Sequence, residues 1–223
     1  MFRGIVDLVK RQRRPAVFAP VLGLALIVLG TAAHAAGDAA AGKSLYPVCT
    51  ACHGPAGLGN QAMNAPKLAG QEPWYLIRQM QLFQTGARGT APGDMHGMQM
   101  AAMAKGPQLA TEAALANLAA YVASFPVEPV TPTVQGDIAA GEKLYVVCAA
   151  CHGQKAEGLE AMAGPRLAGQ SDWYLVAQIK KFRDGQRGYD DSDHAGRQMR
   201  PMVATLADDK AINDVVAYIT SLQ

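Results

Sequence analysis

The sequence contains little charge, few aromatic residues and only four cysteines. Charged residues occupy 17% of the 223 positions and aromatic residues 6%, whereas 50% of the positions are hydrophobic. This balance is typical of a globular chain and excludes a disordered one. The formal net charge is only +2, and the body of the chain has no cluster of Lys and Arg, which argues against nucleic-acid binding.

The sequence also lacks any long alternation of apolar and polar residues, which a half-buried β-strand would require. Apolar residues recur instead at helical spacing, as at Leu76, Met80 and Phe83. A second run of this kind spans residues 115–122 and follows Thr111, a residue type that favours the N-cap of a helix. The sequence therefore predicts an all-α fold.

The positive charge is concentrated at the N-terminus. Residues 1–35 hold five basic residues and one acidic residue, which leaves 15 basic and 17 acidic residues in the remainder. An apolar run at 16–30 precedes small residues around Ala35, which is the pattern of a secretory signal peptide. An uncleaved membrane anchor is the alternative, but the run is shorter than the ~20 residues that a span needs. Cleavage after Ala35 would place the mature chain in a bacterial periplasm.

Most of the chain consists of two copies of one sequence repeat. The segment GDAAAGKSLYPVCTACHG at 37–54 aligns without a gap with GDIAAGEKLYVVCAACHG at 136–153. The segments at 66–89 and 165–188 align at the same offset of 99 residues. The offset falls to 97 in the last predicted helix, because the first module carries two extra residues just after Met103.

A proline-rich segment separates the two copies. Residues 126–135 read PVEPVTPTVQ, and the three prolines prevent a continuing helix and favour an extended chain. The sequence thus predicts a first module at 36–125, a stiff linker at 126–135 and a second module at 136–223. Asp38 and Asp137 are each placed to cap a first helix that runs up to the cysteines.

All cysteines lie in two CxxCH motifs, CTACH at 49–53 and CAACH at 148–152. A redox dithiol of the thioredoxin type would accompany a βαβ pattern, which the sequence lacks. A zinc site shared by both motifs would leave each module without a centre of its own. Covalent attachment of haem fits better, because it uses every cysteine and supplies a large apolar group to two small modules. The predicted attachment residues are Cys49, Cys52, Cys148 and Cys151.

The histidine that follows each cysteine pair, His53 or His152, is the predicted proximal ligand of the haem iron. A ligating histidine needs a hydrogen-bond acceptor for its second ring nitrogen, which fixes the tautomer and the ring orientation. A proline lies 13 residues after each histidine, and its carbonyl group has no competing N–H. We therefore predict that the carbonyl groups of Pro66 and Pro165 hold the two rings.

The distal ligand should be a methionine that the chain brings back to the other face of the porphyrin. Met100 and Met199 lie in register between the modules, each 47 residues after its histidine, and are the predicted ligands. Met103 and Met202 are also in register and stay open as alternatives, although flexible core packing is the commoner role of such residues.

Two further methionines, Met95 and Met98, have no counterparts in the second module. A soft Cu(I) site is a rival interpretation of the methionine cluster, because thioethers select that ion, but the missing counterparts weaken it. His96 and His194 lie near the methionines but out of register with each other. They are expected to face solvent rather than to bind a metal ion.

Together these motifs carry a family resemblance. The order of CxxCH, P-[KR]-L-A-G-Q, WYL..Q...F..G.RG, a methionine loop and a final helix containing LAAYVAS resembles class I c-type cytochromes. The tandem arrangement behind a leader is similar to the dihaem cytochrome c4 family. The resemblance implies two tandem cytochrome c domains, two covalently bound haem c groups and His/Met ligation at both irons.

The resemblance also implies an electron carrier rather than an enzyme. It would pass electrons in the periplasm from respiratory or dehydrogenase donors to a terminal acceptor such as a haem-copper oxidase, through transient protein partners. Association with membrane respiratory complexes belongs to this expectation, whereas nucleic acid and small-molecule substrates do not. Two alternatives stay open: a dihaem peroxidase, with His96 or His194 as the acid-base group, and a cytochrome subunit of a periplasmic dehydrogenase.

Overall fold

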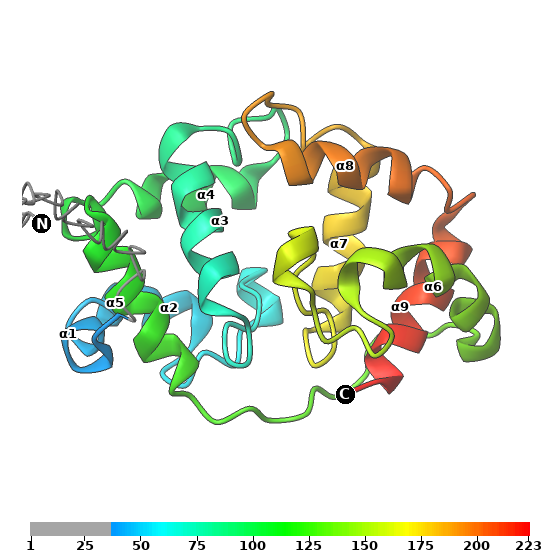
Figure 1. Cartoon of the computed structure of the whole chain (residues 1–223), viewed down its shortest axis with the longest axis horizontal. Coiled ribbons are helices and arrows are strands. Elements are labelled where there is room, and N and C mark those ends of the chain that lie inside the picture. The colour runs from blue at the N-terminus through cyan, green and yellow to red at the C-terminus, as the bar shows by residue number, and fades with distance from the viewer. Residues whose placement is uncertain (1–36) are drawn as a thin grey trace, which may run out of the picture. The chain divides into compact units, whose positions relative to one another are not determined.

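The structure is a computed structural model that describes residues 37–223, so the predicted signal peptide at 1–35 lies outside the described residues. Within 37–223 the regular structure is helical apart from two isolated β-bridges, and the predicted all-α class is confirmed. No helix of this part is both long and apolar enough to cross a membrane. Figure 1 shows the helices coloured in chain order.

The two copies of the repeat form two similar sets of helices. Between residues 37 and 126 these are α1 (Ala39–Lys43), α2 (Pro47–His53), η1 (Gln61–Met63), α3 (Pro73–Thr85), α4 (Met95–Ala104), η2 (Pro107–Leu109) and α5 (Glu112–Ala123), where η marks a 3-10 helix. Between residues 136 and 223 they are α6 (Ile138–His152), η3 (Glu160–Met162), α7 (Asp172–Arg183), α8 (His194–Val203) and α9 (Asp209–Ser221).

The predicted first helix is continuous in the second module but broken in the first. There α6 runs unbroken to the end of its CxxCH motif, whereas its counterpart is split into α1 and α2. Pro47 explains the break, because it has no N–H for a helix interior and instead occupies the first turn of α2. The second module has Val146 at this position. The prediction of one helix is therefore wrong for the first module, although Asp38 and Asp137 cap α1 and α6 as expected.

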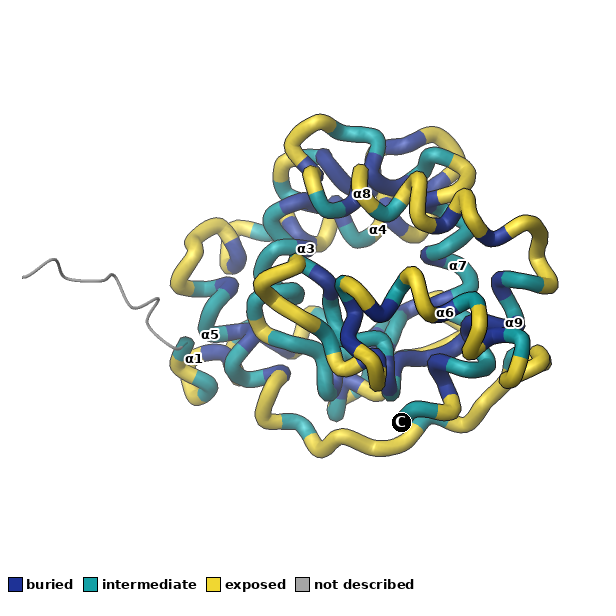
Figure 2. The backbone as a smooth tube through the Cα atoms, turned by 45° about the vertical axis from the view of Figure 1, so that its right-hand side comes forward, coloured by how far each residue is buried: buried dark blue, intermediate teal, exposed yellow. Residues whose placement is uncertain are grey.

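In each module the first and last helices cross at very short range. Gly42 of α1 and Gly141 of α6 lie at these crossings, where an added Cβ atom would come within 1.9 Å and 2.0 Å of a backbone oxygen of α5 and α9, respectively. Only glycine allows this approach. The buried faces of α5 and α9 complete the two cores, as the dark segments in Figure 2 indicate.

Residues 126–135 form no helix and run as an extended, mostly exposed segment (Figure 2), as the prolines predict. The segment is nevertheless tied to both modules. The Asp172 carboxylate of the second module accepts hydrogen bonds from Oγ1 of Thr133 at 2.7 Å and from N of Val134 at 2.6 Å. Lys67 of the first module is buried, and its Nζ donates to a linker carbonyl and to a carbonyl of the second module.

Candidate functional site

Each CxxCH motif forms the end of a helix that packs on its module core. Cys49 and Cys52 lie on α2, and Cys148 and Cys151 lie on α6; all four are half-buried and none forms a disulfide. Burial, with a smaller contribution from the neighbouring cysteine, raises the pKa of Cys49 and of Cys148 to about 11. Such thiols stay protonated at neutral pH, unlike the low-pKa nucleophile of a redox dithiol. The redox alternative is therefore disfavoured.

Both motif histidines are buried and are held by the predicted proline carbonyl groups. Nδ1 of His53 lies 2.9 Å from the carbonyl oxygen of Pro66, and Nδ1 of His152 lies 2.7 Å from that of Pro165. Because a carbonyl group only accepts, Nδ1 carries the proton and Nε2 keeps a free lone pair. Burial lowers the pKa of both rings, against the opposing effect of this hydrogen bond, and favours the neutral imidazole that binds iron.

In each module one tyrosine fixes the backbone just after the motif histidine. Gly54 and Gly153 end α2 and α6 with φ angles of 79° and 84°, a region that favours glycine. Their carbonyl oxygens accept hydrogen bonds from the phenol groups of Tyr46 at 2.7 Å and Tyr145 at 2.8 Å. Burial raises the pKa of Tyr46 to about 12, so its hydroxyl group remains a donor at neutral pH. The position of each histidine is thus fixed by its own helix.

The candidate distal ligands lie on the paired helices α4 and α8. Asp94 and Asp193 cap these helices, and their Oδ1 atoms accept from a backbone N–H of the first turn at 2.9 Å and 3.0 Å. Met100 and Met199 are half-buried one turn before the helix ends. Met100 packs against the small core cluster around Phe83.

The alternative methionines differ from the predicted ligands in exposure. Met103 is 47% exposed and Met202 is 40% exposed, whereas Met100 and Met199 are half-buried. The register between the modules is retained, because both pairs occupy equivalent positions on α4 and α8. Each predicted methionine is thus less exposed than its alternative, and Met100 also packs against a core cluster.

The histidines near the methionines form no site of their own. His96 and His194 are both exposed, at different positions of α4 and α8. Among residues 37–223 no group of three or more His, Cys, Asp or Glu side chains could hold a metal ion. Both histidines therefore face solvent, as expected.

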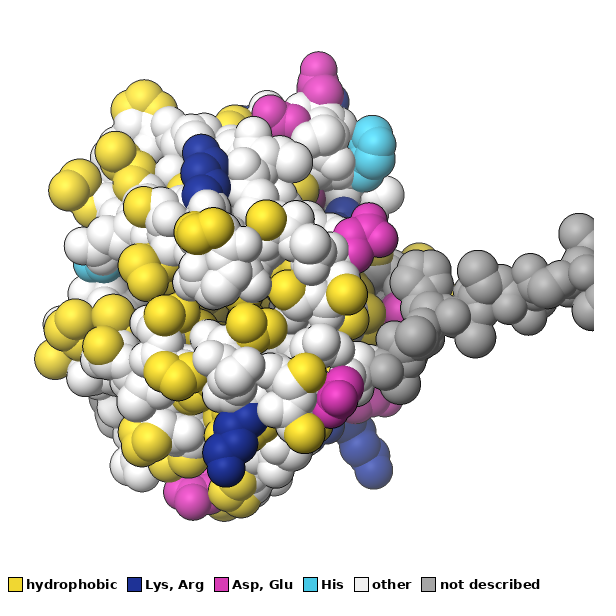
Figure 3. Space-filling view, turned by 90° about the vertical axis from the view of Figure 1, so that its left-hand side faces the viewer, with side chains coloured by type: hydrophobic (Ala, Val, Ile, Leu, Met, Phe, Trp, Pro, Cys, Tyr) yellow, Lys and Arg dark blue, Asp and Glu magenta, His cyan; other side chains and the backbone are white. Residues whose placement is uncertain are grey.

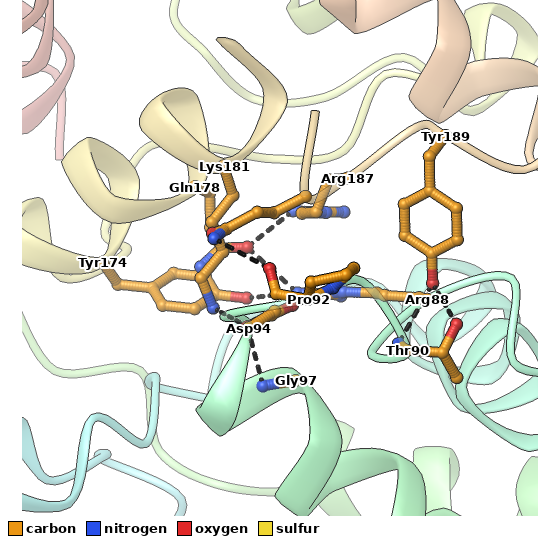
Figure 4. Close-up of polar contacts among 11 residues, drawn as sticks. Arg88, Thr90, Pro92, Asp94, Gly97, Tyr174, Gln178, Lys181, Arg187 and Tyr189 are labelled. Atoms are coloured by element: carbon orange, nitrogen blue, oxygen red, sulfur yellow. Dashed lines mark hydrogen bonds and ion pairs between the residues drawn. The ribbon is translucent and has the colours of Figure 1, made fainter. Parts of the chain in front are cut away.

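A polar network between the two modules lies next to these helices (Figure 4). Arg88 donates from Nη1 to Oε1 of Gln79 at 2.6 Å, and from Nη2 to the Tyr174 hydroxyl and Oε1 of Gln178, both at 3.1 Å. The second module repeats the arrangement in reverse, because Arg187 donates to Oε1 of Gln178 at 3.0 Å and to Oε1 of Gln79 at 3.2 Å. Each arginine therefore binds groups of both modules.

The arginines are also fixed within their own modules. The guanidinium carbon of Arg88 lies 4.5 Å from the centroid of the Phe83 ring, and that of Arg187 lies 4.3 Å from the centroid of the Phe182 ring. The sequence signal for this network is the repeated pattern Q...F..G.RG, in which Gln and Arg recur at an offset of 99 residues. The pattern alone does not reveal that the two copies face each other.

Comparisons with known proteins agree with this arrangement. The sequence model of the cytochrome c family matches residues 39–126 and 138–223. Cytochrome c4 from Azotobacter vinelandii is 38% identical over 212 residues, which cover 88% of this chain and 96% of that protein. The chain belongs to the cytochrome c4 family. This membership confirms two tandem cytochrome c domains and two covalently bound haem c groups.

Two further relatives of this cytochrome c4 family member extend the comparison. The crystal structure of reduced recombinant cytochrome c4 from Pseudomonas stutzeri covers 84% of this chain and 100% of that chain, with 31% sequence identity and a TM-score of 0.66. A thiosulfate dehydrogenase electron acceptor from Thiomonas intermedia is 38% identical over 152 residues, 64% of this chain and 65% of that protein. The family consists of electron carriers, so the protein is a dihaem electron-transfer protein and not a peroxidase.

The residues present fit the cofactor that the family implies. Each module offers a CxxCH motif at a helix end, a neutral histidine with a free Nε2 and a half-buried methionine. A bound haem c supplies a one-electron Fe(III)/Fe(II) couple. Among residues 37–223, Nε of Arg187 is buried and has no hydrogen-bond acceptor, which leaves this N–H available to an anionic group.

Proposed function

We propose that each module holds its haem through its own cysteines, histidine and methionine. For the first module these are Cys49, Cys52, His53 and Met100, and for the second they are Cys148, Cys151, His152 and Met199. The observation that carries this assignment is the pair of histidine-to-proline hydrogen bonds, at 2.9 Å and 2.7 Å. They orient both rings alike and leave Nε2 available to the iron.

We further propose that the protein is a periplasmic carrier. It accepts electrons from respiratory or dehydrogenase donors and passes them to a terminal acceptor such as a haem-copper oxidase, at membrane respiratory complexes. The signal-peptide pattern at 1–35 supports export, and a methionine ligand supports a relatively high potential because it favours Fe(II). The domain boundaries proposed are a leader at 1–35, modules at 36–125 and 136–223, and a linker at 126–135.

The fixed position of each motif histidine supports a role in electron transfer rather than in catalysis. The histidine and the helix end after it are fixed by backbone and phenol hydrogen bonds. A group that exchanges one electron without changing its ligands needs little movement around it. The side chains of each module therefore have to hold the ring and exclude water, and no acid-base group is required.

The test of the carrier role uses the exported, haem-loaded protein. Its intact mass should correspond to a chain beginning after Ala35 plus two haem additions. The chemically reduced protein should support oxygen uptake by a purified haem-copper oxidase, in proportion to its concentration. Absence of oxygen uptake, with normal reduction by a dehydrogenase, would contradict the proposed acceptor and leave the ligand assignment untouched.

A second candidate role is electron acceptance from a thiosulfate-oxidising dehydrogenase, as a separate protein or as a cytochrome subunit. The observation that favours it is the 38% identity to the thiosulfate dehydrogenase electron acceptor of Thiomonas intermedia. The test is stopped-flow reduction of the oxidised protein by a thiosulfate dehydrogenase and thiosulfate. Reduction that saturates with the dehydrogenase concentration supports this role, and reduction no faster than with thiosulfate alone excludes it.

A further inference from the structure

The segment that leads into α4 is bound by side chains of the second module. This segment, residues 86–94, precedes the helix that carries Met100, and Figure 4 shows several of its contacts. The Tyr189 hydroxyl donates to the carbonyl oxygen of Gly86 at 2.9 Å and accepts from N of Thr90 at 3.1 Å. It also lies 2.8 Å from Oγ1 of Thr90. One phenol group of the second module therefore fixes two backbone groups of the first.

Asp94, the last residue of the segment, is also bound by the second module. Its Oδ1 atom caps α4 by accepting from N of Gly97 at 2.9 Å, and the same atom accepts from Nζ of Lys181 at 2.5 Å. The side chain of Asp94 is 1% exposed and that of Lys181 is 17% exposed, so salt and water screen this ion pair little. Between these contacts, Nε2 of Gln186 donates to the carbonyl oxygen of Pro92 at 3.4 Å. The start of α4 is thus attached to the second module by an ion pair as well as by hydrogen bonds.

The corresponding segment before α8, residues 185–193, is not attached in this way. Among residues 37–223, no side chain of the first module forms a hydrogen bond with its backbone. Its capping residue, Asp193, faces one cation of the first module, because Nη2 of Arg78 lies 3.7 Å from its Oδ1 atom. That distance is longer than a hydrogen bond. The start of α8 is therefore held mainly by its own module.

The repeat explains this difference between the modules. At the offset of 99 residues, the three side chains that bind the segment before α4 correspond to shorter or apolar ones: Lys181, Gln186 and Tyr189 correspond to Leu82, Ala87 and Thr90. Leucine and alanine side chains have no polar atom, and a threonine hydroxyl reaches much less far than a phenol group. The first module therefore lacks the groups that would make the same contacts in return, and the attachment has one direction.

We propose that Lys181 and Tyr189 are positioning residues for the methionine helix of the other module. They hold α4 in place, so that the methionine which α4 supplies to the first haem iron stays bound only while the second module is attached. The methionine of α8 does not depend on the first module in this way. Groups that orient a metal ligand from outside typically change its binding when they are removed. The inference rests on the proposed function, in which α4 and α8 each supply one methionine ligand.

The experiment measures how often each methionine leaves its iron in the intact, haem-loaded protein. Binding of imidazole to the oxidised protein is followed by stopped-flow absorbance, because imidazole binds only to an iron whose sixth position is open. Met100→Ala and Met199→Ala should each abolish one slow phase, which assigns the two phases to the two haems. Lys181→Met removes the charge and keeps an unbranched side chain. It should accelerate the phase of the first haem about tenfold and leave that of the second within about twofold of the wild-type rate.

Three matched variants separate positioning from a change in net charge or in overall stability. Lys181→Arg keeps the ion pair with Asp94 and should stay within about threefold of the wild-type rates. Lys180→Met removes the same charge from the neighbouring position, where the lysine binds Asp209 of its own module, and should change neither rate. Arg78→Met removes the long contact in the opposite direction and should change the phase of the second haem by less than about threefold.

Amide hydrogen exchange gives a second measurement, which does not depend on which residue binds the iron. An amide of a helix exchanges when that part of the helix opens. Lys181→Met should accelerate exchange in α4 by about tenfold and leave exchange in α8 unchanged, since the ion pair holds α4 alone. Tyr189→Phe removes only the hydroxyl group and should accelerate exchange in α4 by roughly threefold, as expected for the loss of one hydrogen bond.

Several results would overturn the proposal. Unchanged exchange in α4 of Lys181→Met would show that the ion pair does not hold this helix. Equal acceleration at both haems, or the same acceleration in Lys180→Met, would show a general loss of stability. A tenfold effect of Arg78→Met on the second haem would contradict the single direction. If Met103→Ala rather than Met100→Ala abolishes the phase of the first haem, the ligand assignment is wrong, and faster exchange in α4 still supports the positioning role because Met103 lies on the same helix.

Discussion

Helices α4 and α8 share a frame and differ in their surface. Both begin with a capping aspartate, continue with a buried glycine and carry a half-buried methionine at the same position. The exposed positions of the first turns differ, because Met95 and Met98 of α4 are 62% and 48% exposed, while Arg197 occupies the position on α8 that Met98 occupies on α4. Figure 3 shows a side of the molecule on which hydrophobic side chains are frequent and Lys and Arg are few.

Helices α4 and α8 thus share the positions that support a haem ligand and differ at exposed positions that a partner could contact. The residues proposed to hold the haems recur in register, whereas the exposed residues Met98 and Arg197 occupy equivalent positions and differ in type. An apolar surface favours a partner through desolvation, and a charged surface favours it through electrostatic steering. The two modules therefore present different exposed side chains on α4 and α8.

The largest effect is expected at the distal ligands. Met199→Ala should lower the potential of the second haem by on the order of 0.1 V and open its iron to external ligands, because axial ligands set haem potentials over about 0.8 V. Met100→Ala should do the same to the first haem. Redox titration and cyanide binding measure both effects. The matched controls are Met103→Ala and Met202→Ala, and the assignment fails for any module in which the control, not the ligand variant, opens the iron.

The next effect concerns the helix crossings. Gly141→Ala places a Cβ atom 2.0 Å from a backbone oxygen of α9 and should destabilise the second module by roughly 2–3 kcal/mol, since overpacking typically costs about 1–3 kcal/mol. Gly42→Ala should cost less, because α1 is a separate five-residue helix that can shift. Chemical denaturation of each variant provides the comparison. Equal losses of unfolding free energy would show that the break at Pro47 confers no freedom.

The contact of Asp172 with the linker should make the stability of the second module depend on pH in a way that the first module does not share. Burial opposes ionisation of Asp172, but the hydrogen bonds from Val134 and Thr133 outweigh it and lower its pKa. The first module has Pro73 at this position. A lowered pKa stabilises the fold above the unfolded value near ~3.9, and this stability is lost as the pH falls through the folded pKa. Asp172→Asn should cost about 1–2 kcal/mol near neutral pH and flatten the decline in acid.

Unfolding free energy measured between pH 7 and the acid transition checks this prediction. The control is Asp209→Asn, at an exposed aspartate bound by Lys180 and Arg183, whose loss should change stability much less than the loss of Asp172 because water screens an exposed ion pair. If Asp172→Asn retains the full acid dependence of the wild-type protein, another carboxylate is responsible for it.

The fold and the hydrogen bonds of the two motif histidines could be predicted from the sequence because they depend on local spacing. The CxxCH motifs, the proline 13 residues after each histidine and the capping aspartates act within one module. The contact of the His53 ring with the Pro66 carbonyl was predictable for this reason. The split of the first helix follows from a single residue, Pro47, and was accessible from the same sequence.

The interface between the modules could not be predicted in this way. Gln79 and Arg88 are nine residues apart, but the partners of Arg88 in the second module, Tyr174 and Gln178, lie 86 and 90 residues further along the chain. No periodicity of a helix specifies such contacts. The repeat shows which residues recur, and only the arrangement of the two copies shows that they meet.

The smallest effect on stability is expected from exchanging the surface residues compared above. Met98→Arg and Arg197→Met should each change the unfolding free energy by less than about 0.5 kcal/mol, because both positions are exposed. They should instead change the salt dependence of the electron-transfer rate at the altered module. Met98→Arg should make this rate more sensitive to salt, and Arg197→Met should make it less sensitive. Stopped-flow rates at several ionic strengths measure this. Unaltered salt dependence in both variants would mean that partners dock elsewhere.

The buried Lys67 has a practical consequence for following motion between the modules. Its Nζ is enclosed by carbonyl groups of the linker and of the second module, and burial lowers its pKa. An amine-reactive reagent can reach it only when the modules separate, whereas exposed lysines such as Lys43 react at once. The rate of labelling at Lys67, followed by peptide mass spectrometry, therefore measures how often the interface opens, and no residue has to be introduced for this purpose.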